Sequence, residues 1–182
     1  IAAKILIENR AVINTHLART VGGKVSFTHL IGYAIVEALC EMPQMNVRYS
    51  LSDGKPAIDE RAHVGFGLAI DIQHAGERRL VVPVIHDADT LTFTGFVEAY
   101  QDIISRAKAG SLTAEDYQGA TVTLTNPGTI GTTTSVPRLM NGQGVIIGVG
   151  AMDYPAEFAG VSPRKLALLG IGKTMFISST YD

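Results

Sequence analysis

The stretch between residues 119 and 158 constrains the fold of this chain more than any other part. Val122 and Leu124 alternate there with threonines up to Thr125, and an apolar run follows at residues 145–152. Such alternation is typical of a half-buried strand, and a short apolar run is typical of a buried one. Asn126-Pro127-Gly128 is a turn sequence, because proline fixes its own φ and glycine accepts a positive φ. The sequence therefore predicts a strand at residues 120–124, a tight turn, a Thr- and Gly-rich loop and a second strand.

Thr125 is the candidate functional residue of this stretch, because it stands where the predicted strand ends. A hydroxyl at the end of a rigid strand, beside a loop with open backbone amides, can stabilise a developing oxyanion. The plain alternative is a strand, a turn and some solvated threonines. The residue pattern alone leaves both interpretations open.

Helices and strands are predicted on both sides of this stretch. Helices are expected at residues 1–19, 27–42 and 92–109, because apolar residues recur there at three and four positions. Ser26 is a plausible N-cap, while Pro43 and Gly110 end the second and third helices. A hairpin is expected around Asp53-Gly54. Strands are expected at 64–72 and 80–85, paired antiparallel across the polar connection 74–79, and at 174–180.

Composition excludes several classes of function. The 182 residues suit one domain, and their net charge of −2 gives no electrostatic footprint for nucleic acid. No apolar run approaches a membrane span of about 18 residues. The one cysteine, Cys40, excludes a disulfide framework and indicates a reducing, cytoplasmic setting. The histidines do not form a cluster at metal-ligand spacing, so no metal site is expected.

A high apolar content suggests contact with other chains. Hydrophobic residues make up 46% of the sequence and charged residues only 18%. Mean hydropathy is +0.21, which is apolar for a soluble domain. We therefore expect part of the surface to be buried in an oligomer.

The central stretch resembles the catalytic domain of dihydrolipoyl acyltransferases, the core enzymes of 2-oxo acid dehydrogenase complexes. The resemblance rests on three motifs: Leu124-Thr125-Asn126-Pro127-Gly128-Thr129-Ile130-Gly131, Ser135-Val136-Pro137 and Gly144-Val145-Ile146-Ile147-Gly148-Val149-Gly150. The Thr-Asn-Pro-Gly-Thr-Ile-Gly variant and Met152-Asp153-Tyr154-Pro155-Ala156-Glu157-Phe158 are similar to one branch, found in the multifunctional 2-oxoglutarate dehydrogenase/decarboxylase of actinobacteria. The resemblance covers essentially the whole chain as a single domain, residues 1–182.

The resemblance implies an α/β two-layer sandwich, with a mixed sheet and helices on one face, as in chloramphenicol acetyltransferase. It implies that Thr125 is the catalytic hydroxyl donor and that Asn126 and Ser135 bind substrate. The family's base is the histidine of an Asp-His-Arg motif, and Asp182 matches its aspartate, so Asp182 is the second catalytic candidate. The chain is therefore expected to be a fragment cut just before that histidine. Pro127-Gly128 departs from the commoner Gly-Gly, which puts loop details in doubt.

The implied activity is succinyl transfer from dihydrolipoamide to coenzyme A, within a multifunctional 2-oxoglutarate-oxidising enzyme of the tricarboxylic acid cycle. The implied partners are a lipoylated carrier domain, a fused module that uses thiamine diphosphate and Mg²⁺, and two further copies in a trimer. Two alternatives stay open: a trimer-forming scaffold without activity, and another coenzyme A-dependent acetyltransferase.

Overall fold

A six-stranded mixed sheet forms the centre of the structure, a computed structural model that describes residues 1–74 and 77–182. Its strands are β3 (Phe66–His74), β4 (Glu77–Val81), β5 (Val84–Ile85), β6 (Val122–Thr125), β7 (Val145–Val149) and β8 (Ile177–Tyr181). The order is β4-β3-β6-β7-β8, with β5 paired to β3. β3, β6 and β7 run parallel, and the other pairs are antiparallel. The expected mixed sheet is confirmed.

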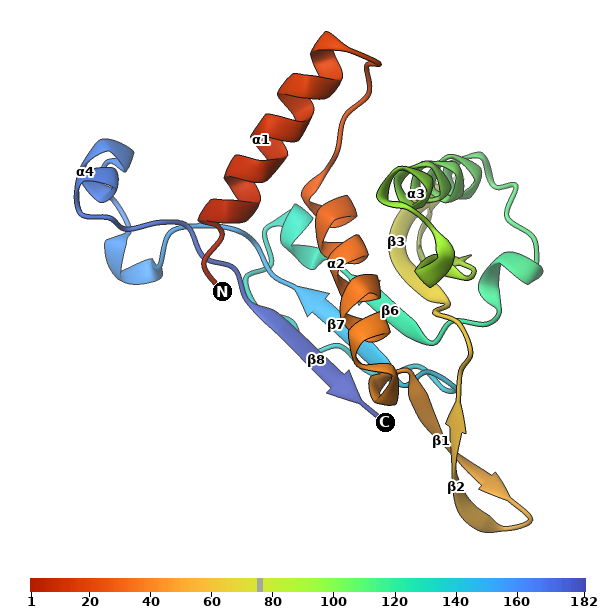
Figure 1. Cartoon of the computed structure of the whole chain (residues 1–182). Helices are drawn as coiled ribbons and strands as arrows, with labels where there is room; N and C mark the ends of the chain where they lie inside the picture. Colours follow the sequence, from red (N-terminus) through yellow and green to blue (C-terminus); the bar gives the residue numbers. More distant parts are fainter. Residues whose placement is uncertain (75–76) are drawn as a thin grey trace.

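Two helices, α2 (Phe27–Glu41) and α3 (Phe93–Ala109), cover one face of this sheet (Figure 1). The Ser26 side chain accepts a hydrogen bond from the backbone N–H of His29 and so caps α2, as predicted. Thr92 caps α3 in the same way, and Gly110 ends it with a left-handed φ of 69°. Local sequence therefore fixes where both helices begin and end.

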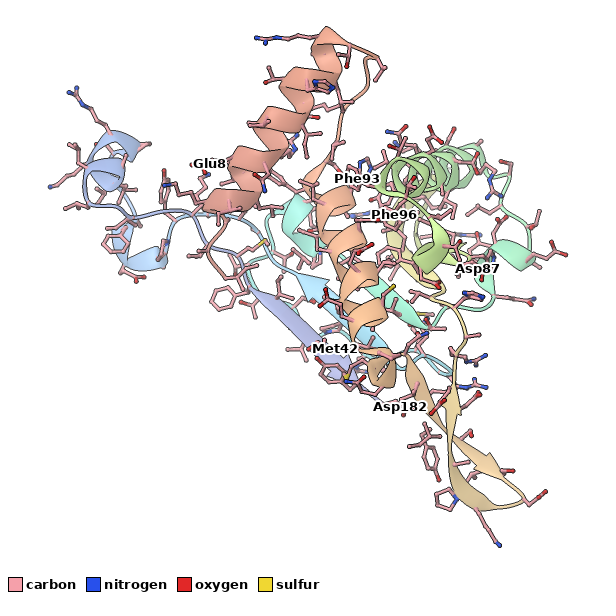
Figure 2. The ribbon with its side chains drawn as sticks, in the orientation of Figure 1. Glu8, Met42, Asp87, Phe93, Phe96 and Asp182 are labelled. Atoms are coloured by element: carbon pink, nitrogen blue, oxygen red, sulfur yellow. The ribbon has the colours of Figure 1, made fainter. Side chains whose placement is uncertain are left out.

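The core lies between these helices and the sheet. Phe66 of β3 and Phe96 of α3 are fully buried, with ring centroids 5.3 Å apart. Figure 2 shows Phe93 and Phe96 on the side of α3 that faces α2, where the Phe93 ring lies 5.3 Å from Tyr33. The remaining members are mainly aliphatic, among them Ile31, Val36, Leu68, Val122, Leu124, Val145 and Val149. This aromatic and aliphatic layer holds the sheet and its helices together.

Three segments extend from this body (Figure 1). Helix α1 (Lys4–Arg19) has no buried residue, although the sequence predicts Ile5 at an apolar position; that side chain is 72% exposed. The hairpin of β1 (Val47–Ser52) and β2 (Lys55–Glu60) is formed as predicted. A short helix, α4 (Pro163–Leu168), forms where the sequence predicts no helix. Among the described helices, none has the length and apolarity to cross a bilayer.

Several predicted strand limits are wrong. The last strand begins at Ile177 rather than 174, because Thr174 forms isolated bridges to Ala2 and Asp153 instead. The strand predicted at 145–152 ends at Val149, where Gly150 turns to bond the backbone of Phe176. The antiparallel partner of β3 is confirmed, but it is split into β4 and β5 and begins at Glu77. The centre of the predicted connection, residues 75 and 76, lies outside the described residues.

The sheet face opposite the helices is covered by the loop between β6 and β7. Pro137 lies over Gly148, where an added Cβ would come within 3.3 Å of the proline ring. Thr123, fully buried, donates a 2.6 Å hydrogen bond to Gln143 Oε1. Ser178 and Thr180 of β8 donate to the backbone oxygens of Ser135 and Pro137. Most side chains on this face are small or polar, although the buried Ile146 of β7 also lies on it.

Candidate active site

Thr125 occupies the last position of β6, as predicted, and its side chain is half-buried. Val122 and Leu124 face the helices, so alternation along the strand places Thr125 on the opposite face. Its register partners are Ala69 on β3 and Gly148 on β7. Thr125 lines a cavity of about 350 Å³ on that face, together with Asn126 and residues of β3 and β4. The hydroxyl therefore stands at a rigid strand end with an open space beside it.

The turn after Thr125 is a single 3₁₀ segment, Pro127–Ile130. The sequence predicts a tight turn and a loop at this place. The segment sits directly on neighbouring main chain: a Cβ at Gly128 would lie 2.4 Å from the backbone carbonyl carbon of Gly150. The amides of Thr129, Gly131 and Thr132 bond to carbonyls inside the turn. These three N–H groups are therefore not open to a ligand, so the open backbone amides expected from the sequence are not found at these positions.

The side chain of Asn126 is bonded to a residue of helix α2. Its Nδ2 donates a 3.0 Å hydrogen bond to Thr28 Oγ1, 98 residues away in the sequence. Thr28 also bonds the Tyr100 hydroxyl of α3, whose pKa is raised because the ring is buried. No sequence motif predicts these contacts. They fix the amide of Asn126, and with it the start of the turn.

A second cavity, of about 330 Å³, lies on the helix side of the same turn. It is lined by α1, α2 and the turn, and Asn126 and Thr129 line both cavities. Arg10 contributes here: its guanidinium lies 4.4 Å from the centroid of the Phe27 ring, and its Nε donates to Val25 O. No sequence motif assigns a role to Arg10. Asn126 thus borders two cavities of similar size, and Thr125 borders the first of them.

Asp182 lies at the other end of the sheet. Its carboxylate accepts a 2.5 Å hydrogen bond from the backbone N–H of Tyr49, and its own N–H donates to Gly144 O. Figure 2 shows it at the end of β8, close to the root of the β1–β2 hairpin. Thr125 is in register with Gly148, and Gly148 with Ser178, four residues before Asp182. The separation is therefore about 13 Å along the strands and about 10 Å across them.

Ser135, the third residue singled out from the sequence, covers β8 rather than the strand end. Its backbone oxygen accepts the 2.5 Å bond from Ser178, and its side chain is half-buried. It does not line either cavity beside Thr125, within the part of the chain that the structure describes. The structure therefore brings Thr125 and Asn126 together but leaves Ser135 and Asp182 apart from them.

Two histidines, His29 and His63, have structural partners. His29 is buried, and its Nδ1 accepts a bond from the backbone N–H of Ser26, which completes a capping box at the start of α2. His63 lies 2.9 Å from Asp89, an interaction that raises the His63 pKa. Among the described residues, no group of three or more His, Cys, Asp or Glu side chains could hold a metal ion. The expectation that the fold needs no metal stays a prediction.

The structure thus has a mixed sheet covered by helices on one face and, at a strand end, a threonine beside a cavity. The model of the 2-oxoacid dehydrogenases acyltransferase (catalytic domain) family matches residues 1–182. The chain belongs to this family, and the resemblance drawn from its motifs is confirmed.

One similar protein is the multifunctional 2-oxoglutarate metabolism enzyme of Mycobacterium sp. (strain JLS), which is 60% identical over 183 residues. The match covers 100% of this chain but 14% of the relative, so the chain spans about one seventh of the relative's length.

Solved structures give the same family. The dihydrolipoamide acetyltransferase of Azotobacter vinelandii, studied for the role of a serine, a histidine and an asparagine in its catalytic mechanism, is 25% identical with a TM-score of 0.75. The cubic core of a pyruvate dehydrogenase multienzyme complex matches with the same identity and TM-score. In both cases the match covers 100% of this chain and 69% of the other chain.

Proposed function

We propose that this domain transfers a succinyl group from dihydrolipoamide to coenzyme A within a longer 2-oxoglutarate-oxidising enzyme of the tricarboxylic acid cycle. The observation that carries the proposal is that Asn126 lines two cavities, of about 350 and 330 Å³, and that its neighbour Thr125 lines the first of them. Transfer between two thiols requires that two long arms reach one point from different directions. The 60% identity to a 2-oxoglutarate metabolism enzyme supports the choice of acyl group.

The reaction exchanges one thioester for another. The coenzyme A thiol loses its proton to a base, and its sulfur forms a bond to the succinyl carbonyl carbon, giving a tetrahedral oxyanion. Collapse of this intermediate breaks the bond to the dihydrolipoamide sulfur, which takes up the proton. Water must be kept out, because it would hydrolyse the thioester.

Thr125 is the donor to the oxyanion in this proposal. The tetrahedral oxygen carries charge that the thioester lacks, so a fixed hydroxyl stabilises the transition state more than the substrate. Asn126 lines both cavities and is fixed by Thr28, so it positions the substrate beside the hydroxyl. Ser135 is proposed to line the channel from the covering loop.

The base is proposed to be the histidine that the family pattern places directly after Asp182. Because Asp182 and Thr125 lie at opposite ends of the sheet, one copy cannot bring base and donor together. The proposal therefore places each active site between two copies of a trimer, with the histidine of one copy facing Thr125 of its neighbour. The cubic assembly of a structural relative supports an oligomer.

The other partners come from the longer protein. A lipoylated carrier domain delivers the acyl group, and a fused module with thiamine diphosphate and Mg²⁺ generates it. In this proposal both cofactors belong to the fused module. The reduced Cys40 suits a cytoplasmic enzyme.

Complementation between two inactive variants of the full-length protein tests the proposal. One variant carries Thr125→Ala, and the other carries alanine in place of the proposed histidine. Each should show little transfer of succinyl from succinyl-dihydrolipoamide to coenzyme A, whereas co-expression should restore a substantial fraction, since mixed trimers hold some intact pairs. Wild-type protein without transfer would favour the scaffold alternative, and inactive mixed assemblies would contradict a shared site.

A further inference from the structure

The cavity beside Thr125 extends to an ion pair on the outer strands of the sheet. Among its described lining residues, only Asp71 and Arg78 are charged; Ala69, Leu80 and Ile130 are apolar. Arg78 Nε lies 3.4 Å from Asp71 Oδ1, and its Nη2 donates to Asp71 Oδ2. The Arg78 side chain is nevertheless 69% exposed. A cation therefore stands at one end of the cavity and a hydroxyl at the other.

Strand register gives the distance between these two ends. Ala69 is the partner of Thr125, and Asp71 follows two residues further along β3. Two residues along a strand and one strand spacing across separate Thr125 and Asp71 Cα atoms by about 8 Å. Because the Arg78 guanidinium is bonded to the Asp71 carboxylate, it stands at a similar distance from Thr125.

The Arg78 guanidinium has further N–H donors besides those that contact Asp71. It carries five N–H groups, and the two bonds to Asp71 use only two of them. The others can bind a second carboxylate in the planar geometry that arginine favours. Asp71 raises the pKa of Arg78, so the side chain stays charged during the reaction.

The succinyl group matches this arrangement in length and charge. Decarboxylation of 2-oxoglutarate leaves a four-carbon acyl group that ends in a carboxylate. Its three carbon–carbon bonds of about 1.5 Å span about 4 Å. A hydrogen bond of about 2.9 Å at each end extends the reach to about 8–10 Å. A succinyl thioester can thus touch Thr125 with its carbonyl oxygen and Arg78 with its carboxylate.

We propose that Arg78, held by Asp71, binds the free carboxylate of the succinyl group and selects it over neutral acyl groups of the same length. The inference rests on the proposed function, and it adds a specificity residue that the family resemblance did not supply. Leu80 of β4 lines the cavity between the two polar ends, beside the methylene carbons.

The test compares succinyl-dihydrolipoamide with butyryl-dihydrolipoamide, in which a methyl group replaces the carboxylate. With the full-length protein, Arg78→Gln should lower kcat/KM for succinyl by about tenfold or more, the size expected for one charge-assisted hydrogen bond. The same variant should lower kcat/KM for butyryl much less, so the ratio of the two shifts. Arg78→Lys, which keeps the charge but not the planar fork, should give an intermediate ratio.

Arg79→Gln is the matched control, because alternation places Arg79 on the opposite face of β4. Its succinyl-to-butyryl ratio should stay at the wild-type value. An unchanged ratio in Arg78→Gln, or an equal loss with both substrates, would overturn the inference while the proposed function stands. Wild-type protein that transfers neither acyl group would overturn the proposed function and this inference with it.

Discussion

The two faces of the central sheet differ in the size of the side chains that they carry. On the helix face, β3 and β6 present large apolar side chains, and Phe66, Val122 and Leu124 are all 0% exposed. On the other face, the neighbouring positions are Gly67, Ala69 and threonines, with backbone packed over them. Bulk on one face gives stability, and the lack of bulk on the other leaves room for a loop and a ligand. Substitutions on the first face should therefore have the larger effect on folding, and those beside the cavity on the second face should change activity.

The largest effect is expected at Phe96, on the helix face. Phe96→Ala removes a fully buried ring from contact with Phe66, so the free energy of unfolding should fall by about 3–5 kcal/mol. Urea denaturation of the domain measures this change. Phe176→Ala is the control, because its side chain is 64% exposed and should shift stability by about 0.5 kcal/mol or less. Similar losses in both variants would show that the two positions do not differ as described.

Thr125→Ala should produce the next effect, on rate rather than on folding. Loss of one oxyanion donor should lower kcat of the full-length protein by about 10²–10³-fold, or about 3 kcal/mol, with little change in the Michaelis constants. Stability should change little, since Thr125 is half-buried beside a cavity. Thr125→Ser keeps the hydroxyl and should keep most of the rate. Near wild-type turnover in Thr125→Ala would make Thr125 an ordinary strand residue.

A polar pair buried under the loop should give a smaller effect on stability. Thr123→Val keeps the side-chain shape but leaves Gln143 Oε1 without its donor, which should cost about 1–3 kcal/mol of unfolding free energy. Adding Gln143→Met should recover most of the loss, because both partners are then apolar. If the double variant is no more stable than Thr123→Val, the hydrogen bond is not what holds this position.

The smallest expected effect is the opposite pH response of two histidines. Burial lowers the pKa of His29 below its ordinary 6.5, so its contribution to stability is present above pH 6.5 and is lost as the pH falls through the lowered value. Asp89 raises the pKa of His63, so that contribution is present below pH 6.5 and is lost as the pH rises through the raised value.

Urea titrations at several pH values separate the two histidines. The stability difference between wild type and His29→Gln should shrink towards pH 5, and that for His63→Gln should shrink towards pH 8. Glutamine suits the capping-box position of His29, so the helix start should persist. Parallel pH profiles for the two variants would contradict this assignment.

The sequence predicts those parts of the molecule that local chemistry decides. Ser26 and Gly110 delimit their helices through caps made within a few residues, and Asn126-Pro127 turns the chain at the strand end. The short helix α4 also has local sequence signals, the N-cap residue Ser162 and Pro163 at the first helical position. The bond from Asn126 to Thr28 could not be predicted, because nothing local connects residues 98 apart.

Tertiary placement decides the rest of the site. The cavity contact of Arg10 depends on how α1 meets α2, and a charged helix face gives no hint of it. The distance between Thr125 and Asp182 depends on the antiparallel register of β8, which sequence patterns do not fix. The roles proposed for these residues came from family motifs rather than from their spacing.

The contact of Gly128 with Gly150 has a consequence for how the sequence can vary. A Cβ at Gly150 would lie 1.9 Å from the backbone oxygen of Thr133, and one at Gly128 would meet the backbone of Gly150. The backbones at Gly128, Thr133 and Gly150 are therefore in direct contact. No rotamer change could relieve the overlap that an added Cβ would cause. Ile130, two residues after Gly128, is 73% exposed and free to differ. One short turn therefore contains a position that accepts only glycine and a position that accepts many side chains. Related sequences should vary at Ile130 and keep glycine at position 128.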